Sequence, residues 1–173
     1  MLKINHNRET LPQGSPSGIA CLDVFSPTIE EAVTLYDPDE NEVTLLAAAD
    51  GTPNLRVHLH ANDLDRSAHF YGDTLALPEV STHCFAVGQS EIQLHAAQEP
   101  VVTPVERGAL GYRYMTVQVF DVVAEHAAVL AGGGAEGMAP VRLGDVAYIS
   151  FVRDPDGNWL EISQRKSITG SLD

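Results

Sequence analysis

The chain has 173 residues, of which 44% are apolar and 20% charged, and its 24 acidic against 10 basic residues give a formal net charge of −14. This composition is typical of a globular protein and excludes a wholly disordered chain. The negative balance disfavours nucleic acid and anionic membranes as partners, because both are bound through clustered positive charge. We therefore expect no nucleic-acid partner and no membrane partner.

The cysteines and the N-terminus indicate a soluble, cytoplasmic protein. Cys21 and Cys84 form no CxxC pair, so the sequence predicts neither a zinc cage of thiolates nor a disulfide scaffold. The first residues turn polar before the apolar region of a signal peptide could form. No apolar stretch approaches the roughly 20 residues that span a bilayer.

The N-terminal part of the chain is predicted to be a lead-in followed by strands. Residues 1–17 are polar and rich in turn formers, which is typical of a loose segment. Residues 18–50 are predicted to be a partial module of strands, without an opening strand and helix of its own. Its strand-like runs are 19–25, 32–36 and 42–48, with an Asp-Pro-Asp-Glu-Asn turn at 37–41.

Residues 54–98 predict a first module in which one helix follows one strand. The run 55–61 alternates apolar and polar residues, as a half-buried strand does. Asp63 is a candidate N-cap for a helix over 64–75, whose apolar residues have helical spacing. Two short strands follow, at 83–88 and 91–96.

The same order recurs over 111–165, and residues 166–173 are a tail. A strand over 112–119 leads to Asp121, the candidate cap of a helix over 122–131 that ends in three glycines. Two β-α-β-β-β modules in an α+β fold are the simplest interpretation of this repeat. The last two predicted strands are 146–152 and 158–163.

Four of these strands have one apolar face and one polar face. The apolar faces are expected to pack under the two helices. The polar faces carry no Lys and are unlike an ordinary solvated face, although a solvated face is the alternative. On one curved sheet they would line a single hollow for a small molecule. The set is Arg56, His58 and His60; Glu91, Gln93 and His95; Tyr112, Tyr114, Thr116 and Gln118; and Trp159, Glu161 and Ser163.

Two segments carry a family resemblance. The sequence VHLHANDLDRSAHFY at 57–71 and FVRDPDGNWLEI at 151–162 resemble the opening and closing parts of modules in the vicinal oxygen chelate superfamily. That superfamily includes glyoxalase I, bleomycin-resistance proteins and extradiol dioxygenases. The resemblance covers 54–165 and implies paired modules that form a curved, cup-shaped mixed sheet. Residues 18–48 resemble part of another module, which would complete a sheet in a second copy or pack against its own chain.

The resemblance also implies a divalent metal held by the first and last strands of each module. The corresponding positions are Arg56 and Gln93 in the first module, and Tyr114 and Glu161 in the second. Glu161 is the residue that the pattern expects, and Gln93 is an acceptable oxygen ligand. Tyr114 is unusual, and Arg56 cannot ligate a metal because it stays protonated.

A displaced set of ligands is the alternative. His58 and His95 lie two residues beyond the expected positions, and with Glu161 they would suit Fe(II), Mn(II), Zn(II) or Ni(II). Without a metal, the two histidines would instead be polar groups of an organic-ligand pocket.

Two functions follow from the resemblance. The first is a metal-dependent lyase, isomerase or dioxygenase of the glyoxalase type, with Glu161 as ligand and catalytic base. The second is a metal-free small-molecule-binding protein of the bleomycin-resistance type. Arg56 would anchor an anionic group, or else form a salt bridge to Glu91 or Glu161. We expect no nucleotide cofactor. We expect the protein to form a homodimer. The predicted substrate-binding residues are Arg56, Gln93, Tyr112, Tyr114 and Trp159.

Overall fold

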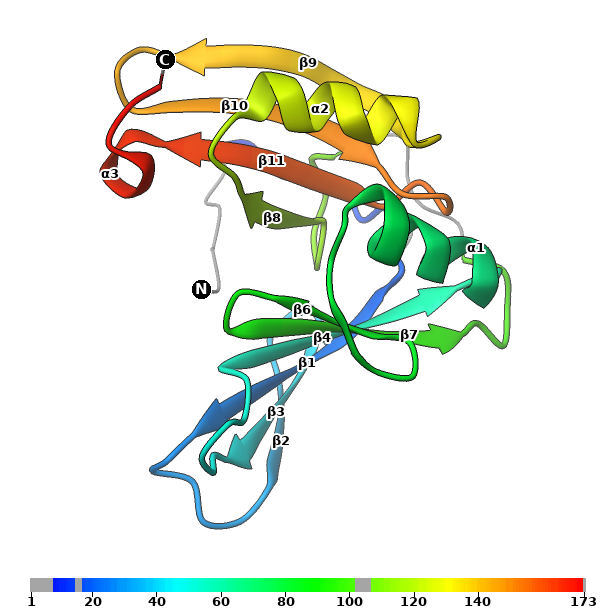
Figure 1. Cartoon of the computed structure of the whole chain (residues 1–173). Helices are drawn as coiled ribbons and strands as arrows, with labels where there is room; N and C mark the ends of the chain where they lie inside the picture. The colour runs from blue at the N-terminus through cyan, green and yellow to red at the C-terminus, as the bar shows by residue number, and fades with distance from the viewer. Residues whose placement is uncertain (1–7, 15–16, 102–106, 173) are drawn as a thin grey trace.

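The computed structural model describes residues 8–14, 17–101 and 107–172, and their strands form two sheets (Figure 1). The larger sheet has seven strands in the order β2-β3-β1-β4-β7-β6-β5, and the smaller has four in the order β8-β11-β10-β9. The predicted α+β class is confirmed. Within the described ranges, every helix is too short or too polar to cross a bilayer.

The N-terminal unit consists of β1 (Ile19–Ser26), β2 (Val33–Tyr36) and β3 (Glu42–Ala47). β1 runs parallel to β3, and β2 runs antiparallel to β3. β1 is therefore an opening strand paired with its closing strand, which corrects the expectation that this unit lacks one. β1 also pairs with β4 of the same chain, so the unit packs against its own first module.

The first module begins with β4 (Leu55–Ala61) and α1 (Leu64–His69). Asp63 caps α1 as predicted, since its side chain accepts a hydrogen bond from the Arg66 backbone N–H. The helix continues as the π-helical segment η1 (Phe70–Thr74). Three strands complete the module: β5 (Glu79–Ser81), β6 (Cys84–Val87) and β7 (Ser90–Ala96). The three-residue β5 follows Pro78 and was not predicted.

The second module has the same order. Its elements are β8 (Tyr114–Gln118), α2 (Val122–Ala131), β9 (Ala135–Leu143), β10 (Ala147–Arg153) and β11 (Trp159–Arg165), followed by α3 (Lys166–Thr169). The sequence did not predict β9, which contains Gly137 and Pro140. Pro140 is tolerated because β9 lies at an edge of its sheet. A Cβ on Gly137 would lie 2.5 Å from the Trp159 ring, so only glycine fits there.

Both modules pair their opening strand with their closing strand in parallel, β4 with β7 and β8 with β11. The other edge of the opening strand differs between them. β4 has β1 as an antiparallel neighbour, whereas β8 is the edge of the four-stranded sheet. The N-terminal unit thus covers the outer edge of β4 in the first module. In the described part of the chain, no strand covers the corresponding edge of β8 in the second module.

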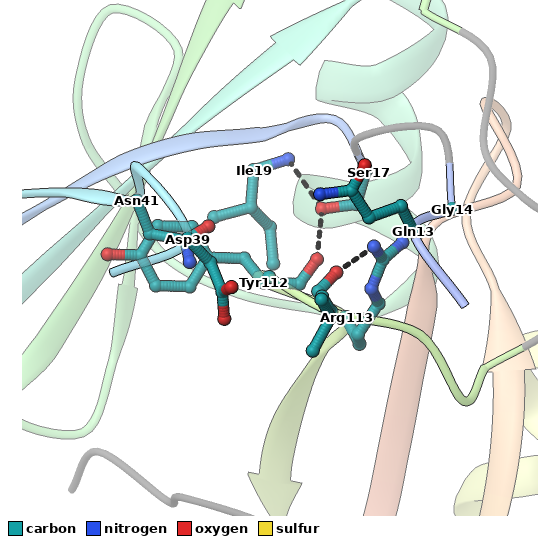
Figure 2. Close-up of a pocket in the computed structure, with 10 residues that line it drawn as sticks. Gln13, Gly14, Ser17, Ile19, Asp39, Asn41, Tyr112 and Arg113 are labelled. Atoms are coloured by element: carbon teal, nitrogen blue, oxygen red, sulfur yellow. Dashed lines mark hydrogen bonds between the residues drawn. The ribbon is translucent and has the colours of Figure 1, made fainter. Parts of the chain in front are cut away.

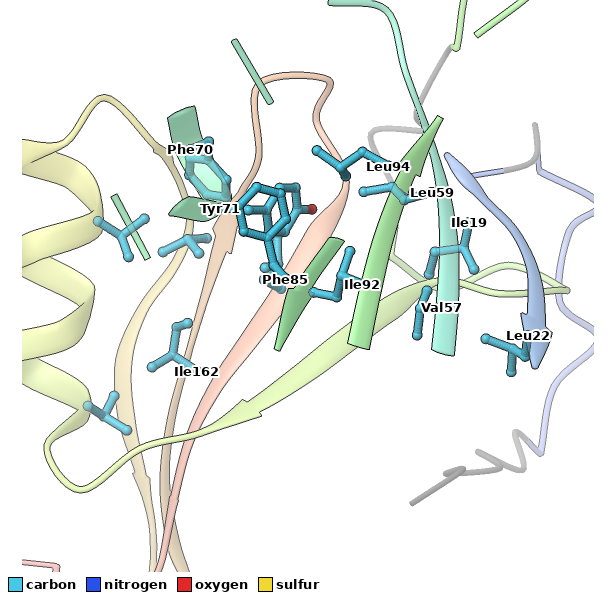
Figure 3. Packing of buried hydrophobic residues seen from close by; sticks show 14 residues of the cluster. Ile19, Leu22, Val57, Leu59, Phe70, Tyr71, Phe85, Ile92, Leu94 and Ile162 are labelled. Atoms are coloured by element: carbon cyan, nitrogen blue, oxygen red, sulfur yellow. The ribbon is translucent and has the colours of Figure 1, made fainter. Parts of the chain in front are cut away.

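A single apolar core joins the two modules (Figure 3). It contains Leu59 and Ile92 from the seven-stranded sheet, Tyr71 from η1, and Leu160 and Ile162 from β11. Burying a side chain of this size contributes roughly 1.5–3 kcal/mol to folding, so this cluster is the main source of stability.

The closing turn of the second module is fixed to the first module by buried hydrogen bonds. The Tyr71 hydroxyl donates to Asp154 Oδ2 at 2.9 Å, and the Gly18 backbone N–H donates to Asn158 Oδ1 at 2.8 Å. Asp154 is 4% exposed and also accepts bonds from the backbone N–H groups of Asp156 and Asn158. The turn therefore connects all three units of the chain.

Candidate functional site

The four strands that were expected to line one hollow belong to two sheets. β4 and β7 lie in the seven-stranded sheet, and β8 and β11 in the four-stranded sheet. The prediction of one shared sheet is corrected for a single chain, because β1 rather than β8 takes the free edge of β4. The structure brings His58 and His95 together, and it leaves Glu161 in the other sheet.

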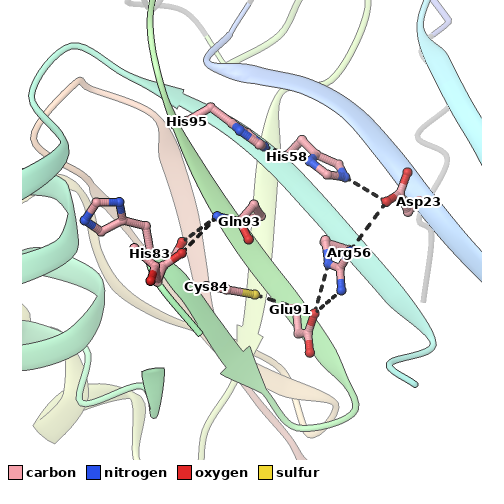
Figure 4. A network of polar contacts seen from close by, with 9 residues as sticks. Asp23, Arg56, His58, His83, Cys84, Glu91, Gln93 and His95 are labelled. Carbon is pink, nitrogen blue, oxygen red and sulfur yellow. Dashed lines mark hydrogen bonds and ion pairs between the residues drawn. The ribbon is translucent and has the colours of Figure 1, made fainter. Parts of the chain in front are cut away.

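A polar network covers β1, β4 and β7 on one face of the seven-stranded sheet (Figure 4). His58 Nδ1 lies 2.8 Å from His95 Nε2, and the two ring planes are nearly parallel, at 20°, with centroids 5.1 Å apart. His58 Nε2 lies 2.8 Å from Asp23 Oδ2. The His58 and Asp23 side chains are 18% and 14% exposed, so this chain of contacts is mostly shielded from water.

Asp23 was not among the predicted site residues. It stands between the apolar residues Leu22 and Val24 on β1, and it lies opposite Arg56 in the antiparallel pairing with β4. The alternation on β1 places Asp23 on the polar face, which was visible in the sequence. The pairing of β1 with β4 was not, because nothing local to either strand specifies it.

Arg56 forms an ion pair with Glu91, which is one of the predicted alternatives. Its Nε and Nη2 each lie 2.9 Å from Glu91 Oε2, and its Nη1 lies 3.9 Å from Asp23. The guanidinium also lies over the Phe25 ring, 5.4 Å from the centroid. Arg56 therefore joins β4 to β7, and its positive charge is largely offset by one carboxylate.

The surroundings of His95 favour its neutral form. Desolvation lowers the pKa of His95 below its ordinary value, and the nearby His58 and His60 lower it further. His60 is exposed and meets the His95 ring edge-on, with centroids 6.1 Å apart. A neutral imidazole in this position can accept a proton at neutral pH.

The two cysteines on this face stay protonated. Burial raises the pKa of Cys21, and Glu42 and Asp23 raise it further. Burial likewise raises the pKa of Cys84, whose Sγ lies 3.5 Å from Glu91. Because the thiolate is the reactive form, neither side chain is set up as a nucleophile.

Gln93 is engaged within the sheet. Its Nε2 donates to the backbone oxygens of Thr82, His83 and Leu94, at 3.1 to 3.3 Å. The bonds to Thr82 and His83 hold β7 against the loop between β5 and β6. The side chain thus has a structural role beside the histidine pair.

The polar face of the second module is filled by its own side chains. Glu161 is 3% exposed and Trp159 is 7% exposed. The Phe151 ring meets Trp159 edge-on, with centroids 5.9 Å apart. Arg107 lies 4.0 Å from the centroid of Phe151, and Arg153 lies 4.2 Å from that of Trp159. Trp159 is therefore covered within the chain rather than open for stacking on a ligand.

The two predicted tyrosines lie in different places. Tyr114 on β8 packs edge-on against Phe151, with centroids 5.4 Å apart. Tyr112 precedes β8, and its hydroxyl donates to the backbone oxygen of Glu42 at 2.9 Å. Burial raises the pKa of Tyr112 to about 12, and Asp37, Cys21 and Glu42 add to the effect.

Tyr112 also lines a separate cavity of about 190 Å³ (Figure 2). This cavity lies between the N-terminal lead-in, the turn that contains Asp39 and Asn41, and the segment 110–113. It is distinct from the histidine pair and contains none of the predicted metal ligands.

The donor set does not fit a metal ion within one chain. Among the described residues, no three His, Cys, Asp or Glu side chains are grouped so that they could hold one. Arg56, at a position where the resemblance implies a ligand, is a cation, and both ring nitrogens of His58 already have protein partners.

Comparison with known proteins identifies the family. Residues 55–162 match the model of the Glyoxalase/Bleomycin resistance protein/Dioxygenase superfamily. The chain belongs to this superfamily. The match spans both modules, and it agrees with the resemblance found at 57–71 and 151–162.

Two curated relatives are named as a lactoylglutathione lyase and a probable lactoylglutathione lyase. A lactoylglutathione lyase of Haemophilus influenzae is 30% identical over 132 residues, which cover 68% of this chain and 96% of that protein. A probable lactoylglutathione lyase of Vibrio parahaemolyticus is 27% identical over 133 residues, which cover 69% of this chain and 95% of that protein. Both relatives match this chain over nearly their whole length.

Solved structures share the fold. A glyoxalase I mutant from Zea mays has a TM-score of 0.67 at 18% identity, covering 91% of this chain and 72% of that chain. A glyoxalase-related enzyme from Fulvimarina pelagi has a TM-score of 0.52 at 19% identity, covering 68% of this chain and 89% of that chain. The 91% coverage exceeds the two modules, so the likeness to the maize protein extends into the N-terminal unit.

Proposed function

We propose that this chain is a small-molecule enzyme of the glyoxalase type, a lyase or isomerase that moves a proton on a substrate with adjacent oxygens. The site is the polar face of the seven-stranded sheet. The observation that carries the proposal is the pair His58 and His95, in contact at 2.8 Å and bordered by Arg56. The two relatives named as lactoylglutathione lyases support the reaction class.

The proposed chemistry is general base catalysis by His95. A neutral imidazole next to the bound substrate removes a proton from the carbon that bears a hydroxyl and adjoins a carbonyl. Arg56 lies two residues before His58 on β4, on the same face, where its charge favours the negative oxygen that develops. Glu91 offsets part of that charge. The main contribution of Arg56 is therefore to the orientation of the substrate, and its contribution to binding affinity is smaller.

The dioxygenase alternative needs a metal with open coordination positions, and the described residues offer no such group. The bleomycin-resistance alternative relies on Tyr114 and Trp159 as stacking surfaces. Phe151 and two arginines cover the Trp159 ring, so no observation favours that alternative over proton transfer.

The test is proton exchange on S-lactoylglutathione in deuterated water. Desalted protein, treated with a chelator, is expected to exchange the proton on the carbon that bears the hydroxyl, followed by nuclear magnetic resonance. His95→Ala should reduce the exchange rate by about 100-fold or more. His69→Ala is the matched control, because His69 is an exposed histidine on α1 that pairs with Asp73. Absence of exchange by the unsubstituted protein, with and without added divalent metal, would overturn the proposal.

A further inference from the structure

The N-terminal unit contributes a carboxylate to the histidine pair. Asp23 lies on β1, outside the family match at 55–162, and reaches the site because β1 is antiparallel to β4. Its Oδ2 lies 2.8 Å from His58 Nε2. The relation to Arg56 is looser, since Nη1 is 3.9 Å away and the guanidinium is bound to Glu91. The short contact of Asp23 is therefore with the histidine.

This contact decides which ring nitrogens carry protons. A carboxylate can only accept, so His58 Nε2 must donate to Asp23. When His58 is neutral, its Nδ1 carries the lone pair and accepts a hydrogen bond from His95 Nε2, and these two atoms lie 2.8 Å apart. The basic nitrogen left on His95 is Nδ1. Asp23 thus determines, through His58, which nitrogen of His95 is available as a base.

We infer that Asp23 is a positioning residue, supplied by the N-terminal unit, that sets the tautomers of His58 and His95 for proton abstraction by His95 Nδ1. The inference rests on the proposed function. As the substrate C–H bond breaks, its electron pair stays on the substrate as an enolate, and an N–H bond forms at His95 Nδ1. The Nε2 proton of His95 can then pass to His58 Nδ1, where the resulting cation lies beside Asp23.

The neighbouring charges support this assignment. The cation formed on the pair meets Asp23 at hydrogen-bond distance, while Glu91, also on this face, is bound to Arg56. His60 is the remaining imidazole beside the pair. The titratable or charged groups that β1, β3, β4, β6 and β7 place on this face are Cys21, Asp23, Glu42, Arg56, His58, His60, Cys84, Glu91 and His95.

The decisive variant is Asp23→Asn, which keeps the size of the side chain and replaces a group that can only accept by an amide that can also donate. Glu31→Gln, at an exposed position of the same N-terminal unit, is the matched control. The imidazole nitrogen spectrum of the unsubstituted protein should report a proton on Nε2 of His58 and on Nε2 of His95. Asp23→Asn should change that tautomer pattern and lower kcat for exchange by about 100-fold, with KM within about threefold.

An unchanged tautomer pattern in Asp23→Asn would overturn the inference, whatever the exchange rate. A changed pattern with an unchanged kcat would also overturn it, because the tautomer would then not matter for proton transfer. The proposed function fails in a different way. If the unsubstituted protein exchanges no substrate proton, the function is wrong for this substrate, whereas the spectra still decide whether Asp23 sets the tautomers.

Discussion

The two sheets are built on the same module, and they make different use of its polar face. In the seven-stranded sheet the opening strand β4 has β1 beside it, and the face holds Asp23, His58 and His95 in contact. In the four-stranded sheet the opening strand β8 is an edge, and Phe151 and Trp159 fill the face over a buried Glu161. The module supplies the alternation of side chains, and the neighbouring strand decides whether a site forms.

The same contrast holds for two nearly identical turns. Asp37 and Asn41 of the N-terminal unit repeat the hydrogen bonds of Asp154 and Asn158 in the second module. The first turn is exposed, and the second is buried against Tyr71. Nearly equal sequence should therefore contribute unequally to the free energy of unfolding.

The largest expected effect is on stability. Asp154→Ala should lower the free energy of unfolding by about 3 kcal/mol or more, because it leaves the buried Tyr71 hydroxyl and Asn158 amide without their acceptor. Asp37→Ala should cost within about 0.5 kcal/mol, since water replaces the lost bonds. Urea unfolding measures both. Equal losses would show that burial of the turn does not matter.

Metal retention is the next test. Because the described residues of one chain hold no group of three metal donors, desalted protein should keep much less than one equivalent of Mn(II), Ni(II) or Zn(II) after loading. Elemental analysis measures the remainder. Retention of one equivalent by the unsubstituted protein, and its loss in Glu161→Gln, would contradict this expectation. That result would indicate that a second copy of the chain completes a metal centre.

The edges of the two opening strands predict the oligomeric state. β4 is already paired on both sides, whereas β8 has a partner on one side among the described residues. An open edge is a template for pairing with another chain, so we expect a homodimer that forms through β8. Light scattering at increasing concentration measures the mass, and a monomer throughout would contradict the expectation.

The two turns should also differ in the sign of their pH dependence. Burial raises the pKa of Asp154 above its ordinary value, so its contribution to stability is present below that value and is lost as pH rises through the folded-state pKa. For Asp37, desolvation is outweighed by the bonds from Asn41 and Asp39, which lower its pKa. Its contribution is present above the ordinary value and is lost as pH falls through the folded-state pKa. Carboxyl carbon titrations check both directions, and shifts of the same sign would contradict this account.

Local patterns predicted most of the elements because each depends on neighbouring residues. The bounds of β4 and α2 and the caps Asp63 and Asp121 agree with the structure. β5 and β9 were missed, since a three-residue strand and a strand interrupted by Gly137 and Pro140 have no clear period.

The site was less predictable because it depends on pairing between distant strands. The alternation of polar and apolar residues correctly placed His58 and His95 on one face. It gave no indication of which strands pair with the two edges of β4. The same limit explains why Glu161 was grouped with the histidines and Asp23 was not. β1 and β4 are distant in the sequence and come together only in the folded sheet, so local patterns could not predict the contacts between them.

The measurement that tests the account most directly compares His95→Ala with Glu161→Gln in the exchange assay. If the seven-stranded sheet holds the chemistry, His95→Ala should lower the rate by about 100-fold or more, and Glu161→Gln should leave it within about threefold. The reverse order, with Glu161→Gln inactive and His95→Ala close to the unsubstituted protein, would assign the chemistry to the second module and contradict the account.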